Sequence, residues 1–526
     1  MLLLPHNDQG TVTWKIWIIS TWLENLDLQR EDESLLQSPG RQLEGLERIE
    51  TEVLIIGGGN AGACLAARLK ALAVDSIILE RTTRPGDNWA LRYDSLRFHV
   101  PTSFCEMPYL GRSLFSSQEP TPSFTFHPGY PPELQTPHRL TRDDLAAQLR
   151  RFIAAFHLNI VTSANIQSTV YNPSTKLWEV TFTTGPGTPH TVVVAQHLVQ
   201  ATGIASQKPY TPSLPNGHLY KGHSLHSASY SNPSASLPAT ATSVAVIGAA
   251  NTAFDILCDL AAASSSRPLS TTMVVRSPTY ILPESYAFDQ RCFGSYDALP
   301  VAVADGNLYT LPTVVDTYLA GGLFSALAAQ EPERYAALEK VGFPVRDSAH
   351  PEENISYNVL ERGGGHYVDI GGTKVLEERR AVVKRGEPVE WTEGGLRFLD
   401  GSELEVDAVI WCTGFEDKNV RTVVEGILGG GGDGKAAQDG LLGPKEIAER
   451  VDATFGVDEE GEIRGLWKRH LRLENYWVMG GHTGQHRWFS RLLALQIKAA
   501  LGGILPPAYR DTEVSKPGRD SGPLQP

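Results

Sequence analysis

A glycine pattern follows the first long apolar run of the chain and has the composition of a phosphate-binding turn. Gly57, Gly59 and Gly62 stand in the order G-x-G-x-x-G directly after the apolar residues 53–56. The first glycine permits the tight turn, the second lets a pyrophosphate approach the backbone, and the third lets helix and strand pack closely. A helix that begins at Asn60 would direct free N–H groups and its positive dipole end at phosphate. The pattern predicts a dinucleotide site.

An acidic residue stands where the ribose of such a dinucleotide would lie. Glu80 ends the predicted strand Ser76–Leu79, which follows the predicted helix Asn60–Leu72. A carboxylate at this point of a strand–turn–helix–strand unit accepts hydrogen bonds from ribose hydroxyls. The first unit therefore contains every element that dinucleotide binding requires.

A second glycine turn is less complete. Gly248 follows the apolar residues 244–247, but Ala250 and Ala253 replace the second and third glycines. A methyl group at the position of closest approach would displace the pyrophosphate slightly. Arg276 ends the next predicted strand, where the first unit has its acid, and such an exchange favours NADPH over NADH. The alternative, an arginine that is only a surface residue, remains open.

Composition and charge limit the classes of function. The chain has 526 residues, 41% hydrophobic and 20% charged, so two or three globular domains are expected. A net charge of −14 argues against nucleic acid as a partner. Five scattered cysteines indicate reduced thiols and a cytoplasmic location. Because none forms a C-x-x-C pair, the sequence also argues against a redox dithiol beside a flavin. No apolar run reaches the length of a transmembrane segment, and nothing in the sequence indicates an oligomeric state.

The order of predicted elements indicates an α/β fold with two Rossmann-like dinucleotide-binding domains. Strands are expected at Val193–Val199, from Ser243, at Thr272–Val275 and at Val406–Ile410, with helices at Thr252–Ala263 and about Gln485–Ala500. We expect the strand at 406–410 and the last helix to close the first sheet. The predicted domains are a first dinucleotide-binding domain at 50–210 and 400–510, an inserted NADPH domain at 211–399, and a flexible tail at 511–526.

The first 49 residues form a predicted extension. Thr13–Leu23 is rich in Trp and Ile and suggests a strand, and the acidic stretch Gln29–Ser38 suggests a linker. A lone strand must pair with something, so we expect it to pack on the body or to be a remnant of a small upstream domain.

A motif between the two turns carries a family resemblance. Residues 220–230 read Tyr-x-Gly-x-x-x-His-x-x-x-Tyr. This resembles the F-x-G-x-x-x-H-x-x-x-(F/Y) motif of flavin-containing monooxygenases, with Tyr220 at the first position. Other segments resemble the fungal and plant YUCCA-type members of that family: Gly86–Trp89, Tyr93–His99, Phe104–Pro108 and Thr413–Phe415, the last with Cys412 in place of the usual alanine. The resemblance covers about residues 50–505.

The resemblance implies a reaction and two cofactors. NADPH would reduce FAD, the flavin would form a C4a-(hydro)peroxyflavin with O2, and one oxygen atom would pass to a small organic substrate, plausibly in secondary metabolism. His226 and Gly222 would lie near the nicotinamide and support it. His99 stands where animal-type members place an asparagine near the flavin, so it is the candidate group on the substrate side. The catalytic candidates are His226 and His99.

The expected cofactor-binding residues come from both turns, from the strand ends beside them and from the last helix. They are Gly57, Gly59, Asn60, Ala61, Gly62, Glu80, Arg81, Trp89, Thr202, Gly203, Gly222, Gly248, Asn251, Thr252, Arg276, Thr413, Gly414 and Gln485. No metal site is expected, because His482 and His486 lack the H-E-x-x-H context of a zinc site.

Several alternatives remain open at the level of sequence. The oxygenated atom could be nitrogen, sulfur or a carbonyl carbon, although Tyr230 stands where Baeyer–Villiger enzymes usually have Trp. The chain could also be an NADPH oxidase or reductase without oxygen transfer, or a flavin-binding protein with impaired catalysis, which Ala250 favours. Loops at about 105–138 and 280–345 are expected to build the substrate pocket.

Overall fold

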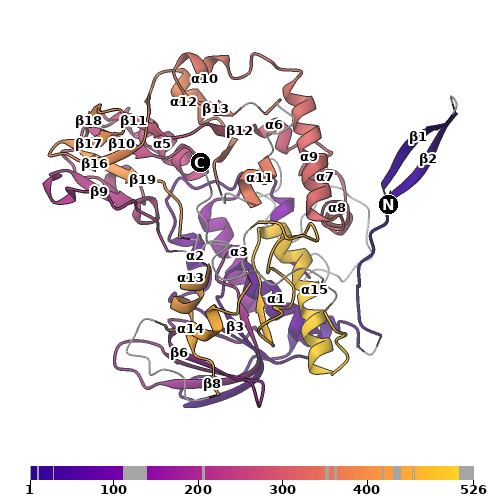
Figure 1. The fold of residues 1–526 in the computed structure, drawn as a ribbon. Coiled ribbons are helices and arrows are strands. Elements are labelled where there is room, and N and C mark those ends of the chain that lie inside the picture. Colours follow the sequence, from indigo (N-terminus) through magenta and orange to yellow (C-terminus); the bar gives the residue numbers. More distant parts are fainter. Residues whose placement is uncertain are drawn as a thin grey trace.

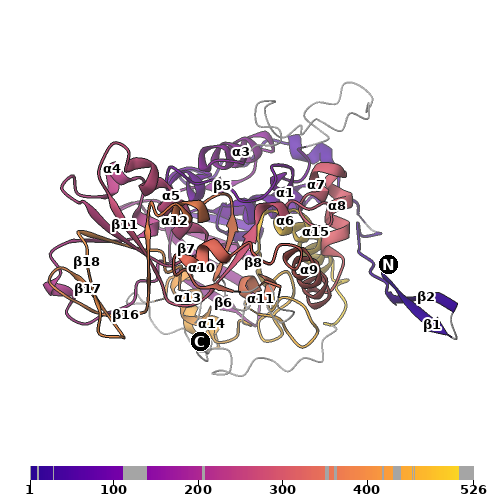
Figure 2. The same cartoon turned by 90° about the horizontal axis from the view of Figure 1, so that it is seen from above.

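Two parallel sheets, each covered by helices, form the body of the molecule (Figures 1 and 2). The computed structural model describes residues 2–8, 11–27, 29–110, 139–203, 208–346, 348–349, 355–360, 364–416, 420–430, 440–452, 454 and 456–508. The predicted α/β class is confirmed. The predicted tail at 511–526 and most of the predicted loop at 105–138 lie outside the described residues.

The first sheet has seven strands in the order β5-β4-β3-β8-β7-β6, with β20 paired to the carboxyl half of β8. Strands β3, β4, β5, β8 and β20 are parallel, and β6 and β7 form an antiparallel extension. The bounds are β3 Arg48–Ile56, β4 Ser76–Leu79, β5 Ile160–Val161, β6 Asn165–Asn172, β7 Leu177–Thr183, β8 Thr191–Gln200 and β20 Tyr476–Val478.

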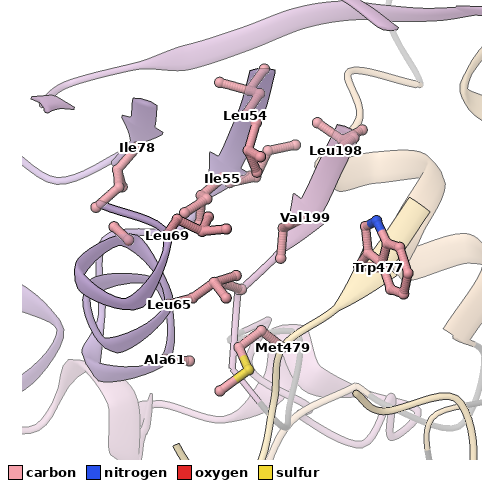
Figure 3. Packing of buried hydrophobic residues seen from close by; sticks show 14 of the residues in the cluster. Leu54, Ile55, Ala61, Leu65, Leu69, Ile78, Leu198, Val199, Trp477 and Met479 are labelled. Atoms are coloured by element: carbon pink, nitrogen blue, oxygen red, sulfur yellow. The ribbon is translucent and has the colours of Figure 1, made fainter. Parts of the chain in front are cut away.

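Helix α1 packs on this sheet and is buried on nearly every face. Its bounds are Asn60–Ala71, one residue short of the prediction. Leu65 and Leu69 of α1 face Ile55 of β3 and Val199 of β8 in the same cluster (Figure 3). Helix α1 also contacts the long C-terminal helix α15, Thr483–Leu501, which confirms the predicted last helix. The other helices on this unit are α2 Asp87–Ala90, α3 Arg142–Ala155, α13 Val420–Ile427 and α14 Pro444–Ala448.

The second sheet is parallel throughout and has the order β15-β11-β10-β19-β9. Its strands are β9 His223–His226, β10 Ser243–Ile247, β11 Ser270–Val275, β15 Val382–Arg385 and β19 Ala408–Trp411. Helix α5, Asn251–Ala263, follows the central strand β10 and buries Phe254 and Leu257 against it. Short helices α4 Pro233–Ser236 and α12 Thr373–Glu377 and the hairpin strands β16 Pro388–Trp391, β17 Gly395–Phe398 and β18 Glu403–Glu405 complete this unit.

One predicted strand belongs to the other sheet. The strand expected at 406–410 to close the first sheet is β19, and it lies between β10 and β9 of the second sheet, so that expectation was wrong. The first sheet is instead completed by β20, which the sequence did not indicate. A short buried apolar strand is compatible with either parallel sheet, because strand pairing is decided by distant partners.

The two crossings between the sheets are paired with each other. The outgoing segment at 208–210 and the returning segment at 413–416 exchange backbone hydrogen bonds: Tyr210 N–H donates to the Gly414 carbonyl at 3.0 Å, and Glu416 N–H donates to the Lys208 carbonyl at 2.8 Å. The Thr413 hydroxyl also donates to the Tyr210 carbonyl. The two units are therefore joined by a short two-stranded connection.

The segment at 280–345, expected to be loops, is mostly helical. It contains α6 Glu284–Ala287, α7 Ser295–Ala298, α8 Val301–Tyr309, α9 Thr313–Ala328 and α10 Ala336–Lys340. A small sheet of β12 Thr279–Pro283, β13 Val345–Arg346 and β14 His366–Asp369 and the helix α11 Ile355–Leu360 lie beside them. Within the described ranges no single helix is long and apolar enough to cross a bilayer, although α8 and α9, bent by 101°, pass that test as a pair.

The N-terminal extension forms a hairpin followed by an anchored segment. The predicted strand at 13–23 is β2, Thr11–Ile18, which ends earlier than expected and pairs with β1, Leu2–Asp8. The hairpin stands away from the body in both views (Figures 1 and 2). The stretch predicted as a linker packs on the body instead: Asp32 N–H donates to the Ala71 carbonyl at 2.7 Å, and Leu36 is fully buried.

A buried histidine joins β8 to β20 and makes stability depend on pH. The Trp477 indole donates to His197 Nδ1 at 3.1 Å, and burial lowers the pKa of His197 to about 4. The neutral ring is therefore stabilising above pH 6.5, and this contribution is lost as the pH falls toward 4. We expect His197 to account for about 2 kcal/mol of the free energy of unfolding lost between pH 7.5 and pH 5.

Urea unfolding of the wild type and His197→Asn at these two pH values measures the contribution. The asparagine carbonyl can still accept from Trp477 and does not titrate. The variant should therefore lose about 2 kcal/mol less than the wild type on acidification. An equal loss in both proteins would contradict the assignment to His197.

Candidate functional site

The first glycine turn lies between β3, α1 and the end of β8. Gly57 has a φ of +109°, and its N–H donates to the Leu79 carbonyl at 2.8 Å. A Cβ on Gly57 would meet the Ala201 carbonyl at 2.4 Å, and one on Gly62 would meet the Gly57 carbonyl at 2.1 Å. Both glycines are therefore required by the close packing of the turn. Thr202 and Gly203 follow Ala201, so the structure brings these predicted residues to the same edge.

Gly59 is different, because close packing does not require it. Among the described residues, a Cβ built there would touch only the Asn88 side chain, at 3.5 Å. Gly59 is the N-cap of α1 and provides no side chain to the first turn, whose N–H groups, those of Asn60, Ala61 and Gly62, have no intrahelical acceptors. The Trp89 indole donates to Asn60 Oδ1 at 2.7 Å. This cradle fits the pyrophosphate of FAD, since amides without intrahelical acceptors border a position where the backbone itself carries no side chain.

Glu80 is tied to the turn. Its Oε2 accepts from the Gly58 N–H at 2.7 Å, and its Oε1 accepts from the Thr82 N–H at 2.8 Å and from the Thr82 hydroxyl. A carboxylate has further lone pairs, so these bonds orient Glu80 and leave it able to accept from a ribose. The next residue, Arg81, is exposed.

The second turn repeats the geometry of the first with less room. Gly248 has a φ of +125°, its N–H donates to the Val274 carbonyl at 3.0 Å, and a Cβ would meet the Cys412 carbonyl at 2.6 Å. Ala250 is the N-cap of α5 in extended backbone, the position that Gly59 has in α1. Asn251 and Thr252 begin the helix. The methyl group of Ala250 therefore projects where the first turn is open.

Arg276 lies at the carboxyl end of β11, on the same edge as the second turn. Its side chain is 69% exposed and pairs with Glu387 at 3.3 Å. A pair this exposed contributes little to stability. The guanidinium is therefore available to a phosphate near the second turn.

His226 and Gly222 lie at opposite ends of one strand. His226 ends β9 at the carboxyl edge, where its Nδ1 accepts from the Ala228 N–H at 3.1 Å and its ring packs edge-on against Phe415 at 5.9 Å. Burial lowers the pKa of His226, and the Gly414 backbone partly opposes this. Gly222 precedes β9 at the amino edge, where a Cβ would meet the Tyr220 hydroxyl at 2.2 Å. The structure therefore does not bring Gly222 to the second turn, and close packing accounts for the glycine.

His99 contacts the second turn from the first unit. Its Nδ1 lies 3.3 Å from Asn251 Oδ1, and its Nε2 lies 3.1 Å from Asp255 Oδ1 on α5. Both ring nitrogens are thus engaged by protein groups, and His99 and Asp255 are both buried. The sequence indicated His99 but not its partner Asp255, which has no spacing signal of its own.

The N-terminus of α15 is lined by aromatic rings. Gln485 Oε1 accepts from the His482 N–H at 3.1 Å, so this predicted cofactor residue caps the helix. The His482 ring lies 5.3 Å from that of Phe104 and 6.0 Å from that of Tyr309. Burial lowers the pKa of His482 to about 3 and that of His486 to about 4, so both are neutral. No cluster of three or more metal ligands occurs within the described segments.

A buried ion pair fixes α15 to its neighbours. Arg487 donates to both carboxylate oxygens of Asp305 on α8, at 2.6 and 2.7 Å, and to the carbonyls of Phe104 and Glu106. Phe104 belongs to the short helix η2, Ser103–Cys105. Sequence reasoning missed this pair, because no local pattern links residues 305 and 487.

Sequence comparisons agree with this geometry. Residues 54–280 match the pyridine nucleotide-disulphide oxidoreductase family. The chain is 27% identical to an indole-3-pyruvate monooxygenase YUCCA1 of Oryza sativa subsp. japonica, over 70% of this chain and 78% of that protein. It is 25% identical to a probable indole-3-pyruvate monooxygenase YUCCA1 of Arabidopsis thaliana, over 78% of this chain and 91% of that protein. All five cysteines are free, unlike those of a disulfide reductase.

Solved structures share the fold. A flavin monooxygenase mutant from Stenotrophomonas maltophilia aligns with a TM-score of 0.51 and 18% identity, over 86% of this chain and 99% of that chain. An NADP+-bound cyclohexanone monooxygenase from Rhodococcus sp. Phi1 aligns with a TM-score of 0.55 and 15% identity, over 87% of this chain and 85% of that chain. Together with the glycine turns and the motif at 220–230, these comparisons show that the chain is similar in sequence to flavin monooxygenases and shares the fold of solved flavin and cyclohexanone monooxygenases.

Proposed function

We propose that this enzyme is an NADPH- and O2-dependent monooxygenase that inserts one oxygen atom into a small organic substrate. The observation that carries the proposal is the pair of parallel sheets, each with a glycine turn and a helix N-terminus after a central strand, β3–α1 and β10–α5. Two such turns in one chain fit two dinucleotides, one donating electrons to the other. Five free cysteines support a reducing, cytoplasmic location.

We assign FAD to the first turn and NADPH to the second. The two Rossmann-like domains would be residues 50–210 with about 412–508, and the inserted residues 211–411. The later boundary follows β19, because that strand pairs within the second sheet. Bound flavin would supply the electron transfer and oxygen activation that side chains lack. Glu80 would accept from its ribose, and the amides of Asn60 and Ala61 would donate to its pyrophosphate.

The chain's own groups would orient the two nucleotides and exclude water. Arg276 would bind the 2′-phosphate of NADPH, since it is exposed at the carboxyl end of β11. His226 is neutral and lies beside the two-stranded connection. It would contact the nicotinamide half of NADPH and exclude water from it. His99 would act through Asn251 at the start of α5.

The substrate would meet apolar and aromatic side chains. Phe104, Tyr309 and His482 form a ring cluster where α8, η2 and the start of α15 meet. Aromatic rings favour flat or apolar molecules, whereas the charges of Arg487 and Asp305 neutralise each other. We therefore propose an aromatic or apolar substrate, as the names of the indole-3-pyruvate monooxygenase relatives also suggest.

Stopped-flow absorbance of the purified holoenzyme tests the function. A monooxygenase should lose its flavin absorbance on mixing with NADPH and then, with O2, show a transient band distinct from oxidised and reduced flavin. Reoxidation without such a band would indicate an oxidase. A flavin that NADPH does not bleach would indicate a binding protein, and a chain without FAD would refute the proposal.

Removing Arg276 should weaken the preference for NADPH. Arg276→Ala is expected to raise KM for NADPH about tenfold, because a charge-assisted hydrogen bond to phosphate is lost, and to leave KM for NADH nearly unchanged. Initial rates with both nucleotides measure this. Arg397→Ala is the matched control, since Arg397 is an exposed arginine paired with Glu390 and Glu403 away from the turn. Equal changes for NADPH and NADH would contradict the role.

A further inference from the structure

His99 presents both of its ring nitrogens to hydrogen-bond acceptors. Nε2 lies 3.1 Å from a carboxylate oxygen of Asp255, and Nδ1 lies 3.3 Å from the side-chain oxygen of Asn251. The orientation of the Asn251 amide is fixed independently, because its Oδ1 accepts from the Val368 N–H at 3.0 Å and its Nδ2 faces His366 Nε2 at 3.5 Å. A neutral imidazole has one donor only, so this arrangement is fully satisfied only by a ring protonated at both nitrogens.

The groups around the ring agree with a protonated His99. On α5, Asp255 supplies the negative charge, and the Tyr93 hydroxyl donates to its second oxygen at 2.6 Å. On β14, burial and the charge of His99 lower the pKa of His366 to about 4, so that ring stays neutral. The remaining neighbour on β14 is Tyr367, whose ring centroid lies 5.9 Å from that of His99. The His99 ring and the Asp255 carboxylate therefore form a closed, buried pair.

The same segment reaches the first glycine turn. Trp89 donates to Asn60, the first residue of α1, and its ring packs edge-on against Phe98 at 5.5 Å. Phe98 precedes His99, which contacts Asn251, the first residue of α5. A continuous line of contacts thus joins the first residues of the two helices that follow the glycine turns.

We propose that Asp255, with Tyr93, is a positioning residue that holds His99 as an imidazolium against Asn251 and thereby fixes the second nucleotide turn relative to the first. This inference rests on the proposed function, since it assigns a purpose to the geometry between the two nucleotide sites. His99 then acts on the cofactor through Asn251 and is not an acid or base for the substrate.

The test combines nucleotide binding with a direct observation of the ring. In Asp255→Asn the charge is lost at constant shape, and we expect calorimetric titration of the oxidised holoenzyme with NADP+ to give a Kd about tenfold higher. Nitrogen-15 spectra of labelled histidine, with the His99 signals assigned by His99→Gln, should show that both ring nitrogens of His99 carry protons in the wild type. Asp255→Asn should show one protonated ring nitrogen.

A matched control lies one turn further along α5. Asp259 accepts from the Tyr230 hydroxyl at 2.8 Å, as Asp255 accepts from Tyr93, but no hydrogen bond joins it to a described histidine. Asp259→Asn should leave the Kd for NADP+ and the His99 signals unchanged. Tyr93→Phe keeps the charge of Asp255 and should raise the Kd for NADP+ less than Asp255→Asn does. It replaces Asp255→Asn as the test variant if that protein does not fold.

Three outcomes would overturn the inference. The first is a neutral His99 in the wild type, and the second is equal NADP+ affinity in Asp255→Asn and Asp259→Asn. The third is an Asp255→Asn variant that loses FAD together with NADP+. A wild-type holoenzyme that does not bind NADP+ would instead refute the proposed function. The nitrogen-15 spectra test the ion pair independently of nucleotide binding, so the two failures are distinguishable.

Discussion

Replacing Gly59 with alanine is expected to give a folded protein without FAD. Gly59 has a φ of −76°, which alanine adopts readily, and the new methyl group would touch only the Asn88 side chain at 3.5 Å. The methyl would, however, occupy the space through which the pyrophosphate approaches the amides of α1. Overpacking by one methyl against a fixed ligand costs about 1–3 kcal/mol, so FAD affinity should fall up to about 100-fold.

Flavin content and stability together measure this effect. Gly59→Ala should purify with little visible flavin absorbance, while its apoprotein unfolds in urea within about 0.5 kcal/mol of wild-type apoprotein. Gly62→Ala is the contrasting variant, because its Cβ would meet the Gly57 carbonyl at 2.1 Å and should destabilise the fold itself. Retention of FAD by Gly59→Ala would mean that the pyrophosphate lies elsewhere.

The second turn offers the reciprocal experiment. Ala250 occupies in α5 the N-cap position that Gly59 occupies in α1. Ala250→Gly removes the methyl group and should lower the Kd for NADP+ several-fold, whereas most substitutions in a binding site weaken binding. Calorimetric titration measures the Kd. Unchanged affinity would show that the nucleotide does not approach this backbone closely.

Arg487→Met should destabilise the protein by about 3–5 kcal/mol, because it leaves the buried Asp305 carboxylate without its cationic partner. Arg487 and Asp305 are both buried, and Arg487 makes two bonds to Asp305 and two to backbone carbonyls. The loss would be concentrated where α15 meets α8 and η2. Urea unfolding monitored by circular dichroism measures it.

A double variant separates the charge from the packing. Arg487→Met with Asp305→Leu removes both charges and should recover most of the lost stability, since an apolar pair avoids the desolvation penalty. Arg397→Met, which breaks only exposed ion pairs, should change the free energy of unfolding by less than about 1 kcal/mol. A double variant as unstable as Arg487→Met would assign the loss to the backbone contacts of Arg487.

Patterns in adjacent residues made the two glycine turns and the helices α1, α5 and α15 predictable. The β3–α1 and β10–α5 units and α15 appear within a few residues of their predicted bounds, because each combines an apolar run, a turn signal and a helical pattern in adjacent residues. The site residues found by sequence are those that the turn itself requires, such as Gly57 and Gly248.

Pairing between distant segments was not predictable. Strand β19 has an apolar composition that fits either sheet, and β20 has only three residues, too few for a pattern. Helix α9 contains Gly321, Gly322 and several β-branched residues that disfavour helix, so local propensity did not indicate it. Asp255 and Arg487 act through partners that are distant in sequence, and no spacing encodes such pairs.

The paired crossings determine how the two units can move. A single covalent linker would allow free swivelling, whereas the strands at 208–210 and 413–416 are hydrogen-bonded side by side. The contacts of Tyr93 and His99 with Asp255 join the same two units at a second place. Because the units are held at both places, swivelling about the connection should be restricted, so that a nucleotide held on one unit keeps its alignment with the other.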